Sequence, residues 1–280
     1  LIVLFRKKEF YFLIEKAKEK IKEFPESFEL YNLIGITFAE IKNIKQSIKY
    51  YKKALIANPK NFISDFYLGS LYHDNGDLLN ALKHYKKSTN LNPKYINAWF
   101  NLGVAYHEDN NPLEAINSYK KVLSIDPKHA NALYNLGYIY HELLDYDKSL
   151  MYYKLAIRIK PGFHYSYSNL AKVFMDNGDY KNSLKYYELF LDKNPNDVKI
   201  LNDVGALFVR LNHYEKSLIY FKNRKLNANC PMVATSFVIP LALFFPLQQF
   251  GNFYGQWSNL FLWFSIGFAI SHYQEWDKRI

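Results

Sequence analysis

Apolar residues recur at helical spacing in pairs of short runs along most of the chain. Within residues 97–127, one run passes through Trp99 and Tyr106, and a second passes through Ile116 and ends at Pro127. A polar break separates the two runs. This pattern predicts two antiparallel helices of about 14 residues joined by a tight turn. Proline ends the second helix because it lacks an N–H group and disfavours helical geometry in the residue before it.

The same pattern returns every 34 residues. The proline at the end of each unit stands at Pro25, Pro59, Pro93, Pro127, Pro161 and Pro195. A small-residue column contains Gly35, Gly69, Gly103, Gly137, Ala171 and Gly205. One aromatic column contains Phe38, Tyr72, Tyr106, Tyr140, Phe174 and Phe208, and another contains Tyr51, Tyr85, Tyr119, Tyr153, Tyr187 and Phe221. A fixed period of this length predicts a stack of one helical unit. We expect the small residues to let paired helices approach closely and the aromatic side chains to fill the seams.

These columns resemble the tetratricopeptide repeat (TPR) family. The third repeat carries the family's residues as Trp99, Leu102, Gly103, Tyr106, Ala115, Tyr119 and Pro127. The resemblance covers roughly residues 1–225 and implies an all-α fold, a right-handed superhelical solenoid of helix-turn-helix repeats. The expected divisions are a partial N-terminal repeat at 1–27, six repeats at 28–61, 62–95, 96–129, 130–163, 164–197 and 198–225, and a hydrophobic tail at 226–280.

The net charge of +10 lies in the repeat region. Many of the lysines fall on the predicted second helices: Lys49, Lys52, Lys53, Lys83, Lys86, Lys87, Lys120, Lys121 and Lys154. The resemblance places these helices on the outer, convex wall, so we interpret the lysines as a solvated face. Binding to nucleic acid is not expected, because it needs stacking aromatic side chains beside the basic groups and the aromatic columns are used in helix packing. One cysteine, Cys230, excludes an internal disulfide.

The family's geometry implies a concave inner surface built from the first helix of each repeat. The candidate peptide-binding residues there are Phe66, His73, Phe100, Asn101, His107, Tyr134, Asn135, Tyr138, His141 and Asn169. Aromatic side chains beside polar groups are typical of peptide recognition. The histidines are each followed by an acid, which leaves a pH-responsive groove and a plain polar surface as alternatives. No metal site is predicted, because neighbouring first helices pack about 8–10 Å apart and equivalent histidines cannot share one ion.

The asparagine column, Asn101, Asn135 and Asn169, continues as Asp203. It resembles the asparagine ladder of the repeats in O-linked N-acetylglucosamine transferases, which implies binding to the backbone of extended peptides. The alternative is that these amides form inter-helix hydrogen bonds. The lysine–asparagine pair with which related repeats clamp the C-terminal carboxylate of heat-shock chaperones is absent from all six repeats, so such chaperones are not expected partners.

The tail has a different composition. Residues 226–274 contain no Asp, Glu, Lys or Arg, and two apolar runs lie at 232–246 and 260–270. Basic residues on both sides and flanking aromatic residues favour a membrane anchor of one or two passes through residues 232–273. Two alternatives stay open. The tail could fold back into the groove, or it could come from a join near Asn229, since it faintly resembles the end of membrane-bound O-acyltransferases.

No catalytic residues and no cofactor are predicted. The chain lacks G-x-S-x-G, P-loop and H-E-x-x-H motifs and any cysteine pair, and its acids and histidines are spread at repeat intervals. We therefore expect a non-enzymatic interaction scaffold that binds a peptide segment of a partner at the cytoplasmic face of a membrane. Two alternatives are the substrate-recruiting superhelix of a glycosyltransferase whose catalytic domain lies outside this chain, and a scaffold that organises a multiprotein assembly.

Overall fold

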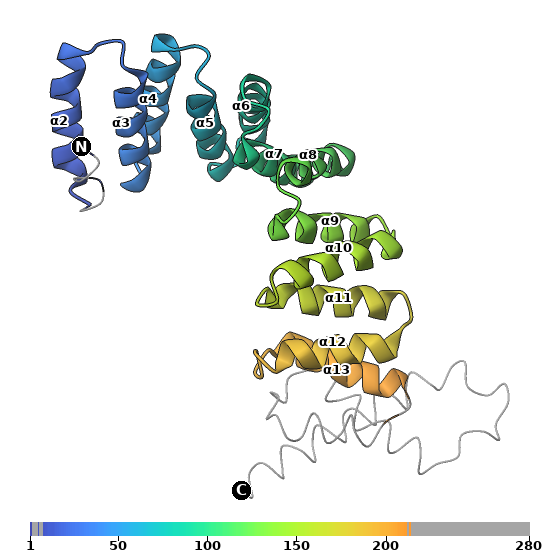
Figure 1. Cartoon of the computed structure of the whole chain (residues 1–280). Helices are drawn as coiled ribbons and strands as arrows, with labels where there is room; N and C mark the ends of the chain where they lie inside the picture. The colour runs from blue at the N-terminus through green and yellow to red at the C-terminus, as the bar shows by residue number, and fades with distance from the viewer. Residues whose placement is uncertain (2–4, 6–7, 212, 214–280) are drawn as a thin grey trace, which may run out of the picture. The chain divides into compact units, whose positions relative to one another are not determined.

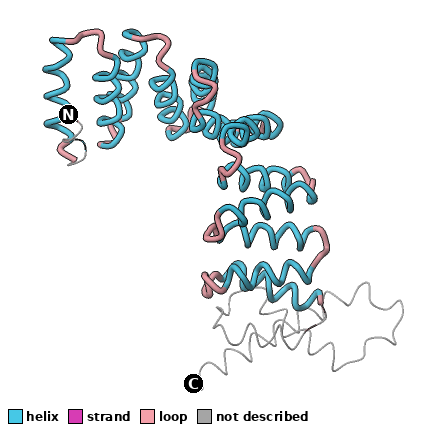
Figure 2. Tube along the Cα trace, viewed as in Figure 1, coloured by secondary structure: helices cyan, strands magenta, loops and turns pink. Residues whose placement is uncertain are grey.

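The computed structural model describes residues 1, 5, 8–211 and 213, and its regular elements in these residues are helices (Figures 1 and 2). Their bounds are α2 (Phe10–Glu23), α3 (Phe28–Glu40), α4 (Ile44–Ala57), α5 (Phe62–Asp74), α6 (Leu78–Leu91), α7 (Ile96–Glu108), α8 (Pro112–Ile125), α9 (Ala130–Glu142), α10 (Tyr146–Ile159), α11 (His164–Asp176), α12 (Tyr180–Leu191) and α13 (Val198–Arg210). The predicted all-α class and the pairing of helices through short turns are confirmed for this part of the chain. The second helix of the predicted sixth repeat and the predicted tail, 226–280, lie outside the described residues.

The turn inside each repeat is set by two recurring features. A side-chain oxygen at the N-cap of the second helix accepts a backbone N–H three residues on, as at Asn43, Asp77 and Asp179. The preceding turn needs a left-handed residue, which is glycine at Gly76 and Gly178 (φ 78° and 81°). At the equivalent positions of other repeats, the residues Lys42, Asn110 and Leu144 adopt φ of 56–59°. The turn is therefore conserved in shape although glycine marks only part of the series.

The chain divides into two compact units, one ending at Leu144 and the other beginning at Asp145. In the first unit, the two helices of each repeat pack together, and the second helix also packs against the first helix of the next repeat. In addition, α3 contacts α5, and α5 contacts α7. The first helices α3, α5 and α7 thus lie next to one another, and the second unit repeats the pairing with α10–α13.

Paired helices approach each other through the glycine column. A Cβ atom on Gly35, Gly69 or Gly103 would lie only 2.6–2.8 Å from the ring of the tyrosine on the second helix of the same repeat. These rings belong to Tyr51, Tyr85 and Tyr119, and each of those tyrosines is 1% exposed. The predicted role of the small residue is confirmed at these three positions: the tyrosine ring occupies the space that a side chain would need.

In the part of the chain that the structure describes, no helix is both long enough and apolar enough to cross a bilayer. The apolar runs from which the sequence predicts an anchor lie beyond residue 213, outside the part that the structure describes.

Candidate functional site

The predicted site residues of the first unit lie on three successive first helices. They are Phe66 and His73 on α5, Phe100, Asn101 and His107 on α7, and Tyr134, Asn135, Tyr138 and His141 on α9. Asn169 lies on α11, in the second unit. We call the surface formed by the exposed side chains of α3, α5, α7 and α9 the first-helix wall. It is the part of the predicted groove that one unit of the structure contains.

Histidine–glutamate pairs join successive repeats along this wall. His73 Nε2 lies 2.8 Å from Glu108 Oε2, and His107 Nε2 lies 2.6 Å from Glu142 Oε2. The sequence places each histidine beside the acid of its own repeat, but the structure pairs it with the acid of the following repeat. The reason is helical geometry, because adjacent residues point about 100° apart around the axis. The pairs therefore link α5 to α7 and α7 to α9.

Aromatic surface on the wall comes mainly from α7 and α9. Tyr138 is 39% exposed, and its ring stands edge-on to His107 at 5.5 Å. Phe100 is half-buried against Tyr119, with ring centroids 5.6 Å apart. Phe66 requires a correction, because it is only 9% exposed and packs within the core of the second and third repeats. It offers little surface to a partner.

The asparagine column makes hydrogen bonds between repeats. Asn101 Nδ2 donates to Tyr85 Oη over 3.4 Å, and Asn135 Nδ2 donates to Tyr119 Oη over 2.9 Å. The donor and acceptor are 16 residues apart in both cases. This constant spacing between the tyrosine and asparagine columns is a signal that sequence reasoning missed. The alternative of inter-helix bonding therefore holds for both amides, while each side-chain carbonyl oxygen accepts no hydrogen bond from the described residues.

Charge is segregated by helix from α3 to α9 of the first unit. The helices α3, α5, α7 and α9 contain no lysine or arginine, and their acidic residues are Glu29, Glu40, Asp65, Asp74, Glu108 and Glu142. The helices α4, α6 and α8 contain Lys45, Lys49, Lys52, Lys53, Lys83, Lys86, Lys87, Lys120 and Lys121, with Glu114 as their one acid. Asp65 is buried and pairs with Lys87 of α6, so it does not belong to the wall. The other five acids are exposed, and the first-helix wall is thus acidic, whereas the face formed by the second helices is basic.

On α13 in the second unit, Asp203 takes the place of the asparagine. Tyr187 Oη donates to its Oδ2 over 3.3 Å. Burial raises the pKa of the Asp203 carboxyl above its usual range, and the Tyr187 hydroxyl offsets this only in part. The folded state therefore disfavours the ionised form. The resulting loss of stability is present at pH values above the raised pKa and disappears as the pH falls below 3.8, the usual value.

Asp203→Asn is expected to stabilise the second unit at neutral pH. Asparagine removes the buried charge and can accept the same hydrogen bond from Tyr187. The gain at pH 7 should be at most about 0.5 kcal/mol, because solvent screens this partly buried group. It should vanish at pH 3, where Asp203 is protonated. Melting temperatures of both proteins at the two pH values test this, and an equal gain at both would contradict it.

The side chains of the first-helix wall are suited to binding a partner. Among the described residues, no group of three or more His, Cys, Asp or Glu side chains could hold a metal ion. What the wall offers is aromatic surface, amide carbonyl oxygens and carboxylates at repeat intervals, which can bind apolar side chains, peptide N–H groups and cations.

Comparisons with known proteins agree with this geometry. The family model described as TPR repeat matches residues 69–110 and 114–143. Two models described as tetratricopeptide repeat also match. One covers residues 130–163, and the other covers 28–61 and 164–197. No curated protein sequence matches the chain.

Several solved structures are similar to this chain. The MamA protein is 28% identical, with a TM-score of 0.58 over 62% of this chain and 96% of its own. YrrB, described as a TPR protein with an unusual peptide-binding site, is 15% identical, with a TM-score of 0.61 over 67% of this chain and 97% of its own. Part of a repeat protein from Cytophaga hutchinsonii is 16% identical, with a TM-score of 0.72 over 84% and 96%. The last two likenesses concern the fold alone.

Proposed function

Because the chain belongs to the tetratricopeptide repeat family, we propose that it is a protein-interaction scaffold whose first-helix wall binds an extended segment of a partner protein. The observation that carries this proposal is the series of unlike binding groups at successive repeats on one wall. Tyr138 offers exposed aromatic surface, and Asn101 and Asn135 keep a carbonyl oxygen that can accept a peptide N–H. A peptide lying along the wall can meet such groups one repeat at a time.

The charge of the first-helix wall indicates which charge the partner segment should carry. Its charged side chains are all acidic, and those of Glu108 and Glu142 are 50% and 47% exposed. A lysine- or arginine-containing segment with aromatic or apolar residues complements it, while an acidic segment is repelled. The glycosyltransferase-linked alternative is not part of the proposal, because Asn101 and Asn135 each use an amide N–H inside the fold.

Peptide selection tests this function. Random 12-residue peptides displayed on phage are selected on the full chain, and selected peptides are then measured on Tyr138→Ala and on a control, Tyr11→Ala. Tyr11 is 76% exposed and lies on α2, which is not one of the wall helices. We expect peptides enriched in Lys and Arg whose affinity falls about tenfold in Tyr138→Ala, the loss typical of an interface tyrosine. Unchanged affinity in Tyr138→Ala for every selected peptide would exclude binding at this wall.

The second part of the proposal concerns residues 226–280, whose composition motivates a membrane tether that holds the scaffold at the cytoplasmic face. Carbonate extraction and flotation compare the full chain with a chain ending at Lys225. We expect only the full chain to resist extraction and to float with membranes. If both chains are extracted, the tail is no integral anchor, and the wall's function stands independently.

A further inference from the structure

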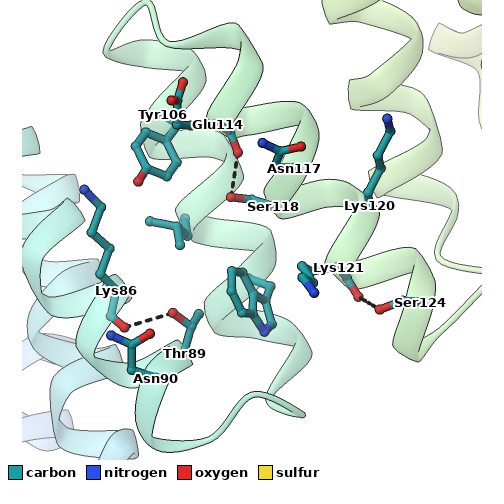
Figure 3. A pocket seen from close by; sticks show the side chains of 12 residues that line it. Lys86, Thr89, Asn90, Tyr106, Glu114, Asn117, Ser118, Lys120, Lys121 and Ser124 are labelled. Atoms are coloured by element: carbon teal, nitrogen blue, oxygen red, sulfur yellow. Dashed lines mark hydrogen bonds between the residues drawn. The ribbon is translucent and has the colours of Figure 1, made fainter.

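A second candidate binding site lies on the first unit, on the other face of α7. A cavity of about 660 Å³ is lined by α6, α7 and α8 (Figure 3). From α7 it receives Trp99, Leu102 and Tyr106, whereas Phe100 and His107 belong to the wall. At 100° per residue these two sets lie on different sides of the helix. The cavity is an open depression on the surface, wide enough to receive side chains of a partner protein.

The lining combines an apolar floor with hydrogen-bond donors. Trp99 Nε1 donates to the Pro93 carbonyl oxygen over 2.9 Å, so the one polar atom of the indole is satisfied and its ring adds apolar surface. Lys86 and Lys121 lie on opposite sides of the cavity (Figure 3). Lys86 Nζ is 5.0 Å from the centre of the Tyr106 ring, and neither lysine has an ion-pair partner among the described residues.

The remaining polar side chains of the lining also leave mainly hydrogen-bond donors for a ligand. The hydroxyl groups of Thr89, Ser118 and Ser124 donate to carbonyl oxygens of their own helices. The donors left for a ligand are therefore mainly the lysine ammonium groups and the amides of Asn90 and Asn117, which have no hydrogen bond within the described residues. Glu114 is the one carboxylate in the lining. Such a site favours a ligand that carries acceptors and negative charge.

The preceding repeat shows what a lysine at this position binds. Trp99 and Lys121 correspond, 34 residues earlier, to Asp65 and Lys87. Asp65 is fully buried, and its carboxylate lies 3.0 Å from Lys87 Nζ and 2.9 Å from His84 Nδ1. In the second repeat the chain itself therefore supplies a carboxylate to this lysine. In the third repeat an indole ring replaces that carboxylate, and the cavity opens beside Lys121.

We propose that this cavity binds an acidic segment of a partner protein, with a carboxylate between Lys86 and Lys121 and an apolar side chain on Trp99 and Leu102. The site goes beyond the proposed function, because it lies on another face and selects the opposite charge from the first-helix wall. One chain can thus hold a basic segment on the wall and an acidic segment on its outer face at the same time.

Selection against matched variants tests the proposal. Random 12-residue peptides are selected on the full chain and counter-selected on Lys86→Gln/Lys121→Gln. The control, Lys49→Gln/Lys52→Gln, removes two lysines of the same basic face outside the cavity. We expect the peptides lost in counter-selection to be rich in Asp and Glu around an apolar residue. Their affinity should fall about five- to tenfold in the cavity variant and less than twofold in the control, and should weaken as NaCl rises.

Trp99 provides a direct readout, because the other tryptophans of the chain are Trp257, Trp263 and Trp276. In a full chain in which those three are replaced by phenylalanine, a selected acidic peptide is expected to shift the emission of Trp99. Tyr138→Ala should leave this shift unchanged, which separates the cavity from the wall. The proposal is overturned if the lysine-dependent peptides are not acidic, if none depends on the two lysines, or if Trp99 emission does not respond at saturation.

Discussion

Tyr119→Ala is expected to lower the free energy of unfolding of the first unit by about 3–5 kcal/mol, the range for truncating a large buried aromatic residue. Tyr119 is 1% exposed, lies over Gly103 and contacts Phe100. Its hydroxyl also accepts the amide N–H of Asn135. The substitution leaves a cavity in the seam between α7 and α8 and removes the hydrogen-bond partner of an amide on α9.

Urea unfolding followed by circular dichroism measures this loss, with Tyr11→Ala as the control for truncating an exposed tyrosine. Tyr119→Phe separates the two contributions, because it keeps the ring and removes only the hydroxyl, which should cost about 0.5–1.5 kcal/mol. Because each repeat contacts only its neighbours, the transition can be broader than two-state, and a second spectroscopic probe should accompany the first. A loss below about 1 kcal/mol for Tyr119→Ala would contradict the assigned packing, given the cost of even small core deletions.

Gly69→Val is expected to destabilise the same unit by about 1–3 kcal/mol through overpacking. A Cβ at this position would lie 2.6 Å from Cδ1 of Tyr85, whose ring is buried and cannot move aside without disturbing its neighbours. In an open helix interior, replacing glycine by a residue with a side chain usually gains up to about 1 kcal/mol, so steric crowding must outweigh that gain here.

Gly162→Ala is the matched control, because a Cβ there would meet no atom within 4 Å. Thermal unfolding of the two variants and of the wild type should show a lower melting temperature for Gly69→Val alone. If Gly69→Val melts at the same temperature as the wild type, the prediction that α5 and α6 pack closely at this glycine is wrong. The same role assigned to the other glycines of the column would then be wrong too.

The helices and their pairing could be predicted from the sequence because the relevant physics is local. Apolar spacing, the prolines after the second helices and the N-cap residues Asn43 and Asp77 act within a few residues of where they stand. The 34-residue period then multiplies each local signal. Even the space left by Gly69 for Tyr85 could be anticipated, since both residues belong to one repeat and recur in fixed register.

Contacts between side chains of different repeats were harder to predict from the sequence. The sequence did not show that His73 bonds to Glu108 or that Asn135 bonds to Tyr119. It also presented Phe66 as a groove residue, although the structure buries it. The cavity beside Trp99 could not be foreseen either, since Trp99 fits the family pattern as core and its exposure depends on how α6 and α8 flank α7.

The sequence alone thus determined the all-α class, the repeat period and the column of small residues, because each depends on interactions within one turn or one helix pair. Only the tertiary structure decided which side chains meet across repeats, which face of α7 is acidic wall and which is basic cavity. Those outcomes depend on the rotation and offset between neighbouring helices, which the apolar pattern within one helix does not set.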